Sequence, residues 1–154
     1  MEREKIIFDK IGALIPGYRG YAEREGRRQC DKLLREEIAS IIAQCEKIIT
    51  DQIDAEVKNR DTTKAGMLEN NRKYLNTLAS KIKFAPYGAS SFFSNSQIKE
   101  AELEQIYKKD LDILEKANSL KQNINNRGSE EALLEIKEIE ELLTARNQFI
   151  KEFK

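Results

Sequence analysis

The sequence predicts an all-α protein, an antiparallel up-down-up-down bundle of four long helices preceded by a short amphipathic helix. Apolar residues recur at three- and four-residue steps along most of the 154 residues, and only seven glycines and two prolines interrupt them. A short turn, one long loop and a second short turn join the long segments, which is the connectivity of such a bundle. Because the length is that of one domain, we expect residues 1–154 to form a single helical-bundle domain.

The short first helix is predicted over residues 1–15. Ile7, Ile11 and Ile15 fall on one helical face, and Pro16 followed by Gly17 ends the helix. Its apolar face could enter a membrane interface or seal the bundle. The mixed charges around it favour sealing, so we expect it to pack across one end of the bundle.

The first two long helices are predicted over residues 20–59 and 63–84. The first contains no proline, and Leu34 and Ile38 begin a seam of apolar residues at helical spacing. Asp61 or one of the two threonines after it is expected to cap the second helix.

The last two long helices are predicted over residues 96–125 and 129–153, so the first of them begins at Ser96. The loop before them, residues 85–95, is longer than most connections between bundled helices. Gly128 marks the tight corner between them. Apolar spacing alone does not separate this bundle from a coiled-coil hairpin that completes its core by dimerising. We favour the bundle formed within one chain.

The composition argues against several kinds of enzyme. The chain has no histidine, which removes Ser-His-Asp triads, imidazole zinc sites and the Glu-x-x-His ligands of di-iron bundles. Its two cysteines do not form a Cys-x-x-Cys pair, and neither standard glycine-rich phosphate loop occurs. We therefore expect a protein that is not an enzyme and that needs no cofactor and no metal ion.

One charged pair is expected inside the bundle. Asp110 occupies a seam position among apolar residues, where a carboxylate needs a partner. Arg146 occupies a seam position in the last helix. We expect the two side chains to meet and to fix the register of their helices.

The densest group of arginines lies in residues 18–35, with two tyrosines at its start. Arginine suits bidentate contacts with phosphate or carboxylate, and tyrosine offers a ring for stacking. Three acidic residues among them favour a solvated helical face; protein binding is the next alternative, and RNA or an anionic lipid follows. The candidate binding residues are Tyr18, Arg19, Tyr21, Arg24, Arg27, Arg28 and Arg35.

The long loop carries a second group of candidates, the aromatic residues Tyr87, Phe92 and Phe93. Aromatic side chains in a loop either cover the end of a bundle or anchor a partner. We favour the covering role.

These observations favour a non-enzymatic helical scaffold or adaptor that acts through association with another protein or with itself. The alternative is a module that binds RNA or an anionic surface through residues 18–35. The 27 basic and 27 acidic residues cancel, so any electrostatic partner must be met locally. No segment is long and apolar enough for a transmembrane helix, and a cytoplasmic location is the default expectation.

Self-association would pair the arginine group with the acidic start of the last helix. The facing residues would be Arg24, Arg27 and Arg28 of one chain and Glu131, Glu135 and Glu138 of another.

Overall fold

The computed structural model describes residues 2–94 and 97–154, and its regular elements there are all helical, as the sequence predicts. Within these residues no strand occurs. In chain order the elements are α1 (Glu2–Leu14), α2 (Arg27–Lys58), α3 (Thr62–Lys83), the 3-10 turn η1 (Ser91–Phe93), α4 (Glu100–Asn123), the 3-10 turn η2 (Ile124–Asn126) and α5 (Ser129–Glu152).

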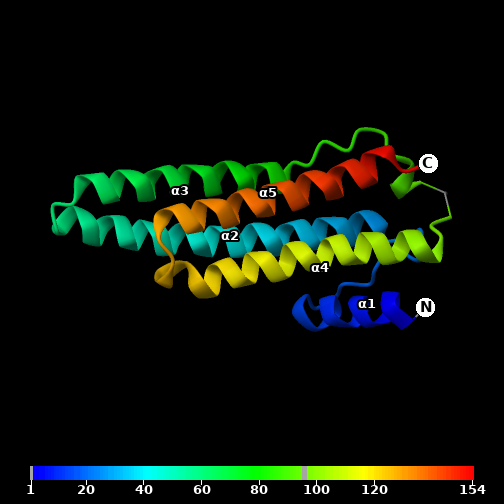
Figure 1. Ribbon diagram of the computed structural model, residues 1–154. Coiled ribbons are helices and arrows are strands. Elements are labelled where there is room, and N and C mark those ends of the chain that lie inside the picture. Colours follow the sequence, from blue (N-terminus) through cyan, green and yellow to red (C-terminus); the bar gives the residue numbers. More distant parts are fainter. Residues whose placement is uncertain (1, 95–96) are drawn as a thin grey trace.

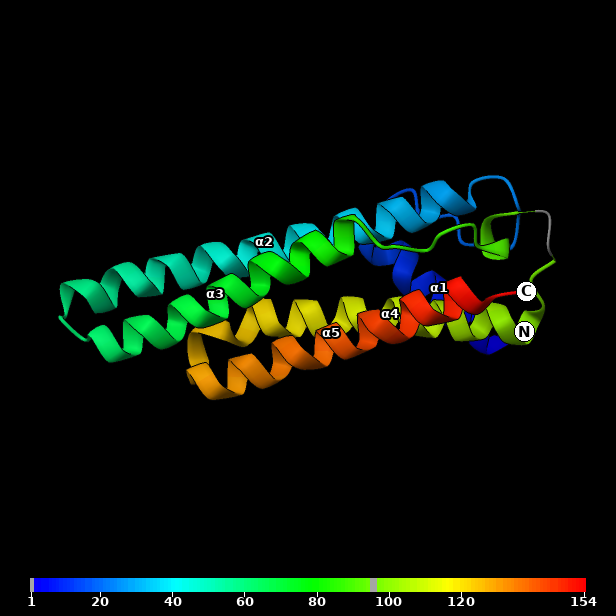
Figure 2. The ribbon, with the colours of Figure 1, turned by 90° about the horizontal axis from the view of Figure 1, so that it is seen from above.

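The four long helices lie side by side and enclose one core. α2 packs against α3 and α4, and α5 packs against α3 and α4. Helices α2 and α4 run in one direction, while α3 and α5 run in the other (Figure 1). Seen from above, α2 and α3 form one layer and α4 and α5 the other (Figure 2).

Helix α1 does not cover the end of the bundle, which corrects the sequence-based expectation. It lies alongside α4, near the end of the bundle where α4 begins (Figures 1 and 2). Ile11 is buried in this contact and Ile15 just after the helix is buried too. The ring of Phe8 lies 5.5 Å from that of Tyr107 on α4. The apolar face of α1 is therefore used against the side of the bundle.

Helix α2 begins at Arg27, seven residues after the predicted start at Gly20. Gly20 has a φ of 80° and Gly26 a φ of 91°, both in the left-handed region. Glycine reaches this region without steric cost, and a continuous right-handed helix cannot contain it. Residues 20–26 therefore form a non-helical connection.

The other helices are close to their predicted ranges. The Asp61 side chain caps α3 by accepting a hydrogen bond from the Lys64 N–H, at 3.0 Å. The predicted start of the next helix, Ser96, lies outside the described residues, as does Met1 of the predicted first helix. Residues 97–99 are not helical, and α4 starts at Glu100.

The α2–α3 hairpin extends beyond the corner that joins α4 to α5 (Figure 1). Two contacts mark where the corner meets the hairpin. Gln52 donates a hydrogen bond to the carbonyl of Ile124 at 3.4 Å, and Asn71 donates to that of Ser129 at 3.0 Å. Val57, nearer the tip, is 60% exposed. Among the described helices, none combines the length and the apolar character that crossing a membrane requires.

Candidate functional site

A buried charged cluster ties α2, α4 and α5 together at the end of the bundle near α1. Arg146 on α5 is fully buried. Its Nε lies 2.5 Å from Oδ1 of Asp110 on α4, and its Nη2 lies 2.8 Å from Oδ1 of Asp31 on α2. The structure thus brings Asp110 and Arg146 together and adds a second carboxylate. One guanidinium pairs with carboxylates from two other helices.

Three tyrosine hydroxyls complete this cluster. Those of Tyr18 and Tyr21 donate to Oδ2 of Asp110, at 2.8 and 2.6 Å. That of Tyr87 donates to Oδ1 of Asp31 at 2.9 Å. Arg146 donates in turn to the hydroxyl oxygens of Tyr21 and Tyr87, at 3.0 and 2.5 Å. The carboxylates are therefore surrounded by donors, which is what buried charges require.

Two glycines bring the tyrosines into the core. Gly17 and Gly20, with φ of 89° and 80°, flank Tyr18 and precede Tyr21. A Cβ on Gly20 would lie 2.3 Å from the hydroxyl oxygen of Tyr107, so any side chain there would force its neighbours to shift. The Tyr107 hydroxyl accepts a hydrogen bond from the Tyr21 N–H at 3.0 Å. The two tyrosines of this Gly-Tyr-Arg-Gly-Tyr segment thus belong to the core.

Burial and mutual charge shift several pKa values in the cluster, and burial raises the pKa of Asp110 above its ordinary value. Burial, and then the charge of Asp110, raise the pKa of Tyr18 and of Tyr21 well above the ordinary value. Burial opposes the charge on Arg146, but the negative charge of Asp110 raises its pKa well above the usual value. The tyrosines therefore remain donors and Arg146 remains charged. Through these buried contacts the cluster links α2, α4 and α5.

Three of the candidate binding residues are inside the protein, contrary to the expectation of an exposed face. Tyr18, Tyr21 and Arg27 are all at most 5% exposed. Arg27 donates to the carbonyl of Tyr21 at 2.9 Å and to that of Phe92 at 3.2 Å. The expectation assumed one helix from Gly20. Tyr18 and Tyr21 lie instead in non-helical chain before α2, and Arg27 is the first residue of α2.

The remaining candidates stay at the surface, in two places. Arg19 lines a hollow between α1 and α4, with Phe8 and Tyr107. Arg24 and Arg28 are exposed near the start of α2, and the guanidinium of Arg28 lies 4.7 Å from the centre of the Phe93 ring. Arg35 is partly buried. The segment therefore does not present one continuous binding face.

The loop aromatics pack against the end of the bundle. Tyr87 and Phe92 are buried, and Phe93 is partly buried. The Phe92 ring lies 5.1 Å from that of Tyr21 and 5.6 Å from that of Phe153. Their arrangement is that of side chains covering the core.

The acidic residues considered for self-association have partners within the chain. Arg127 lies 3.7 Å from Glu131 and 3.1 Å from Glu135. Lys116 forms an ion pair with Glu138. These glutamates thus have cations within the chain, and Arg27, one of the three arginines expected to face them, is buried.

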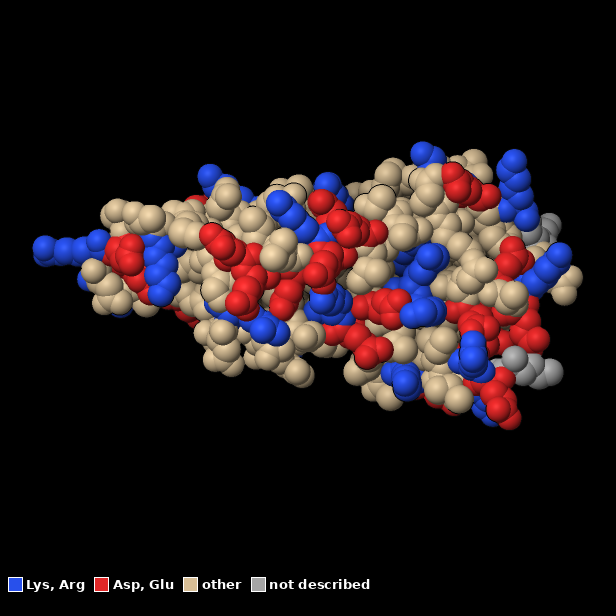
Figure 3. All heavy atoms as spheres, in the orientation of Figure 1, with Lys and Arg blue, Asp and Glu red and all other residues tan. Residues whose placement is uncertain are grey.

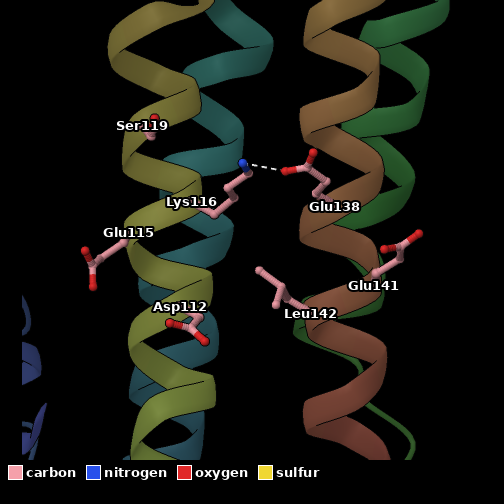
Figure 4. A pocket seen from close by; sticks show the side chains of 7 residues that line it. All are labelled: Asp112, Glu115, Lys116, Ser119, Glu138, Glu141 and Leu142. Atoms are coloured by element: carbon pink, nitrogen blue, oxygen red, sulfur yellow. Dashed lines mark ion pairs between the residues drawn. The ribbon is translucent and has the colours of Figure 1, made fainter.

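A groove of about 650 Å³ runs between α4 and α5 on the surface of the bundle. Figure 4 shows Leu142 pointing into the space between the helices, next to the ion pair that bridges them, while Glu115 and Glu141 point outward on either side. Acidic side chains gather over the middle of this face (Figure 3). The residues that line the groove are Asp112, Glu115, Lys116, Ser119, Glu138, Glu141 and Leu142.

Sequence reasoning missed both Asp31 and the groove. Asp31 stands among arginines, so its sequence context indicates a surface residue. The signal was its helical spacing from Leu34 and Ile38, which are buried and follow it by three and seven residues. The groove depends on which faces of α4 and α5 turn toward each other. That pairing is a tertiary property that apolar spacing leaves open.

Among residues 2–94 and 97–154, no group of three or more Cys, Asp or Glu side chains is arranged to hold a metal ion. No protein-family model matches the chain, and comparisons with curated proteins and with solved structures find no significant match.

Proposed function

We propose that the protein is a non-enzymatic helical scaffold or adaptor, and that a protein partner lays a basic amphipathic helix in the α4–α5 groove. The groove carries this proposal, because it combines acidic side chains with the apolar side chain of Leu142 in an open hollow. Binding of an amphipathic helix in a groove between helices is a common mode of peptide recognition.

The charge of the groove favours a basic partner. Four acids and one lysine line it, and the lysine already pairs with Glu138. Asp112 lies 3.1 Å from Lys108, a solvent-exposed pair. Exposed pairs of this kind contribute little and exchange readily. Lysine and arginine on a partner helix would therefore meet uncompensated carboxylates such as Glu141.

Apolar side chains give such a helix something to bury. Leu142 forms the floor, and Leu134, two turns earlier on α5, is 62% exposed. Positions 134, 138, 141 and 142 recur at helical spacing and so share one face of α5. An incoming helix with leucines two turns apart could contact both leucines and still place basic residues against the glutamates between them.

The walls of the groove are fixed in relation to each other. The Asp110–Arg146 ion pair joins α4 to α5 beside the groove, since Asp110 precedes Asp112 by two residues and Arg146 follows Leu142 by four. At the other end, η2 joins the two helices directly. A groove held in this way loses little conformational freedom when a partner binds.

A labelled 18-residue helical peptide of leucine and lysine tests the proposal by fluorescence anisotropy. We expect saturable binding at low salt, and no binding of the same peptide with glutamate in place of lysine. Glu141→Lys should weaken binding about fivefold, the effect of about 1 kcal/mol at one exposed charge. Asp54→Lys changes an exposed acid of α2 and should leave the affinity unchanged. Equal affinities for the two variants would refute the site.

The alternative partner for the groove is a second copy of this chain. Light scattering at low salt distinguishes it, because a second copy in the groove would give a dimer that Glu141→Lys dissociates. A monomer that binds the peptide supports a partner of a different kind.

A further inference from the structure

A strongly exposed aromatic side chain lies at the end of α3. Phe84 is 78% exposed, more than any other large apolar residue that the structure describes. Its N–H donates to the carbonyl of Ser80, which closes the last turn of the helix at 3.0 Å. Ala85 precedes Pro86 and so disfavours helical geometry, which ends α3 at this point. The ring of Phe84 is thereby left outside the core.

Cationic side chains of α2 lie close to the segment that follows Phe84. Arg28, Lys32 and Arg35 follow one another along one face of α2 and line a hollow of about 380 Å³, whose other wall is residues 85–88. Arg35 donates from Nη1 to the carbonyl of Lys83 at 2.5 Å. This bond attaches the cationic face of α2 to the residue next to Phe84.

The positive charge at this hollow is not neutralised by the acid in its lining. Of the described residues that line it, Asp31 is the one acid, and it already pairs with the buried Arg146. It lies 3.0 Å from Nε of Arg35 as well. Lys32 has only a loose contact, 3.9 Å, with a solvent-exposed Glu36. The hollow therefore favours an anion.

We propose that this basic-aromatic face, formed by Arg28, Lys32, Arg35, Lys83 and Phe84, binds single-stranded nucleic acid. Phosphates would lie against the cations of α2, and one base would stack on the ring of Phe84. A positive groove beside an exposed aromatic ring is the combination that such proteins use, since every base has a face that can stack. This inference goes beyond the proposed function, because the face lies on α2 and α3 and the groove on α4 and α5.

The shape of the surface favours a flexible chain over a lipid bilayer. A membrane-binding surface presents several apolar side chains together, which enter the interface side by side. Here Phe84 stands between Lys83 and the small Ala85, and the cations line a hollow. A single strand can follow that hollow, and a planar bilayer cannot.

Fluorescence anisotropy with labelled 12-residue oligo(U) and oligo(dT) tests this proposal at several salt concentrations. We expect binding that weakens with salt. Phe84→Ala should weaken it about tenfold, as loss of one stacked base does, with the salt dependence unchanged. Lys32→Gln should weaken binding and reduce the slope of log affinity against log salt by about 0.7, the value for one phosphate contact on a single strand.

Two matched variants act as controls. Val57→Ala removes an apolar side chain that is 60% exposed at the hairpin tip, and Lys47→Gln removes a lysine whose side chain is 80% exposed elsewhere on α2. Both should bind as the unchanged protein does, and so should Glu141→Lys. The absence of binding at 50 mM salt overturns the proposal, and so does equal weakening by the controls. Binding to vesicles containing phosphatidylserine without binding to either oligonucleotide also overturns it.

Discussion

At the scale of single residues, Gly20 is the position that allows the least change. Its φ of 80° is one that side chains other than glycine rarely adopt, and a Cβ would clash with the Tyr107 hydroxyl oxygen at 2.3 Å. Gly12, within α1, has no atom within 4 Å of a Cβ. The two glycines therefore have different roles, although both lie near the N-terminal end.

Alanine substitutions separate these roles. Gly20→Ala should lower the free energy of unfolding by about 1–3 kcal/mol, the cost of strained backbone, and the clash adds to it. Gly12→Ala should raise the free energy of unfolding by about 0.5–1 kcal/mol, because alanine is the better residue inside a helix. Urea denaturation followed by circular dichroism measures both. A neutral effect of Gly20→Ala would contradict the close packing described above.

The sequence predicts one part of the buried cluster and not the rest. A charged residue in an apolar seam needs a partner, and this predicts the contact between Asp110 and Arg146. The tyrosines could not be placed in the same way. Tyr18 and Tyr21 are polar enough for a surface. The left-handed conformations of Gly17 and Gly20, which the sequence does not display, accompany their turn toward Asp110.

At the scale of elements, Arg146 joins parts of the chain that are distant in sequence. Its contacts reach α2 through Asp31, α4 through Asp110 and the long loop through Tyr87. Removing it would leave the Asp110 carboxylate buried without its cation, while Asp31 would keep only its contact with Arg35. A lone buried charge costs far more than an ion pair gains at the surface.

Methionine substitutions at two arginines compare these environments. Arg146→Met should lower the free energy of unfolding by about 3–5 kcal/mol, because the buried Asp110 loses its cation. Arg127→Met removes an arginine that also contacts two acids, Glu131 and Glu135, but at the surface. It should cost less than about 1 kcal/mol. Denaturation in urea gives both values, and similar losses would show that the buried cluster does not hold the helices together.

The helices themselves were largely predictable, and their exceptions have a physical cause. Apolar spacing identifies α3 and α5 to within a residue or two, because each has one buried face along its whole length. The start of α2 was predicted too early, because the polar residues before it are compatible with a helix and do not indicate where the helix begins. The position of α1 depends on the aromatic contact of Phe8 with Tyr107, and no periodicity encodes such a contact.

At the scale of the whole molecule, charges of opposite sign are separated although they sum to zero. Residues of α4 and α5 line the acidic groove, and the basic-aromatic face lies on α2 and at the end of α3. These two pairs of helices form separate layers (Figure 2). The net charge of the chain is therefore zero although one region is locally acidic and another locally basic. Such a molecule could hold a basic protein segment and an anionic chain at the same time, which is how a scaffold brings partners together.

The most direct test of the groove is the set of backbone amide shifts in a ¹H–¹⁵N nuclear magnetic resonance spectrum as the leucine–lysine peptide is added. We expect the largest changes at Asp112, Lys116 and Ser119 on α4 and at Glu138 and Leu142 on α5. Amides of the basic-aromatic face should not move. Largest changes outside α4 and α5, or no changes at peptide concentrations that saturate the anisotropy signal, would contradict binding in the groove.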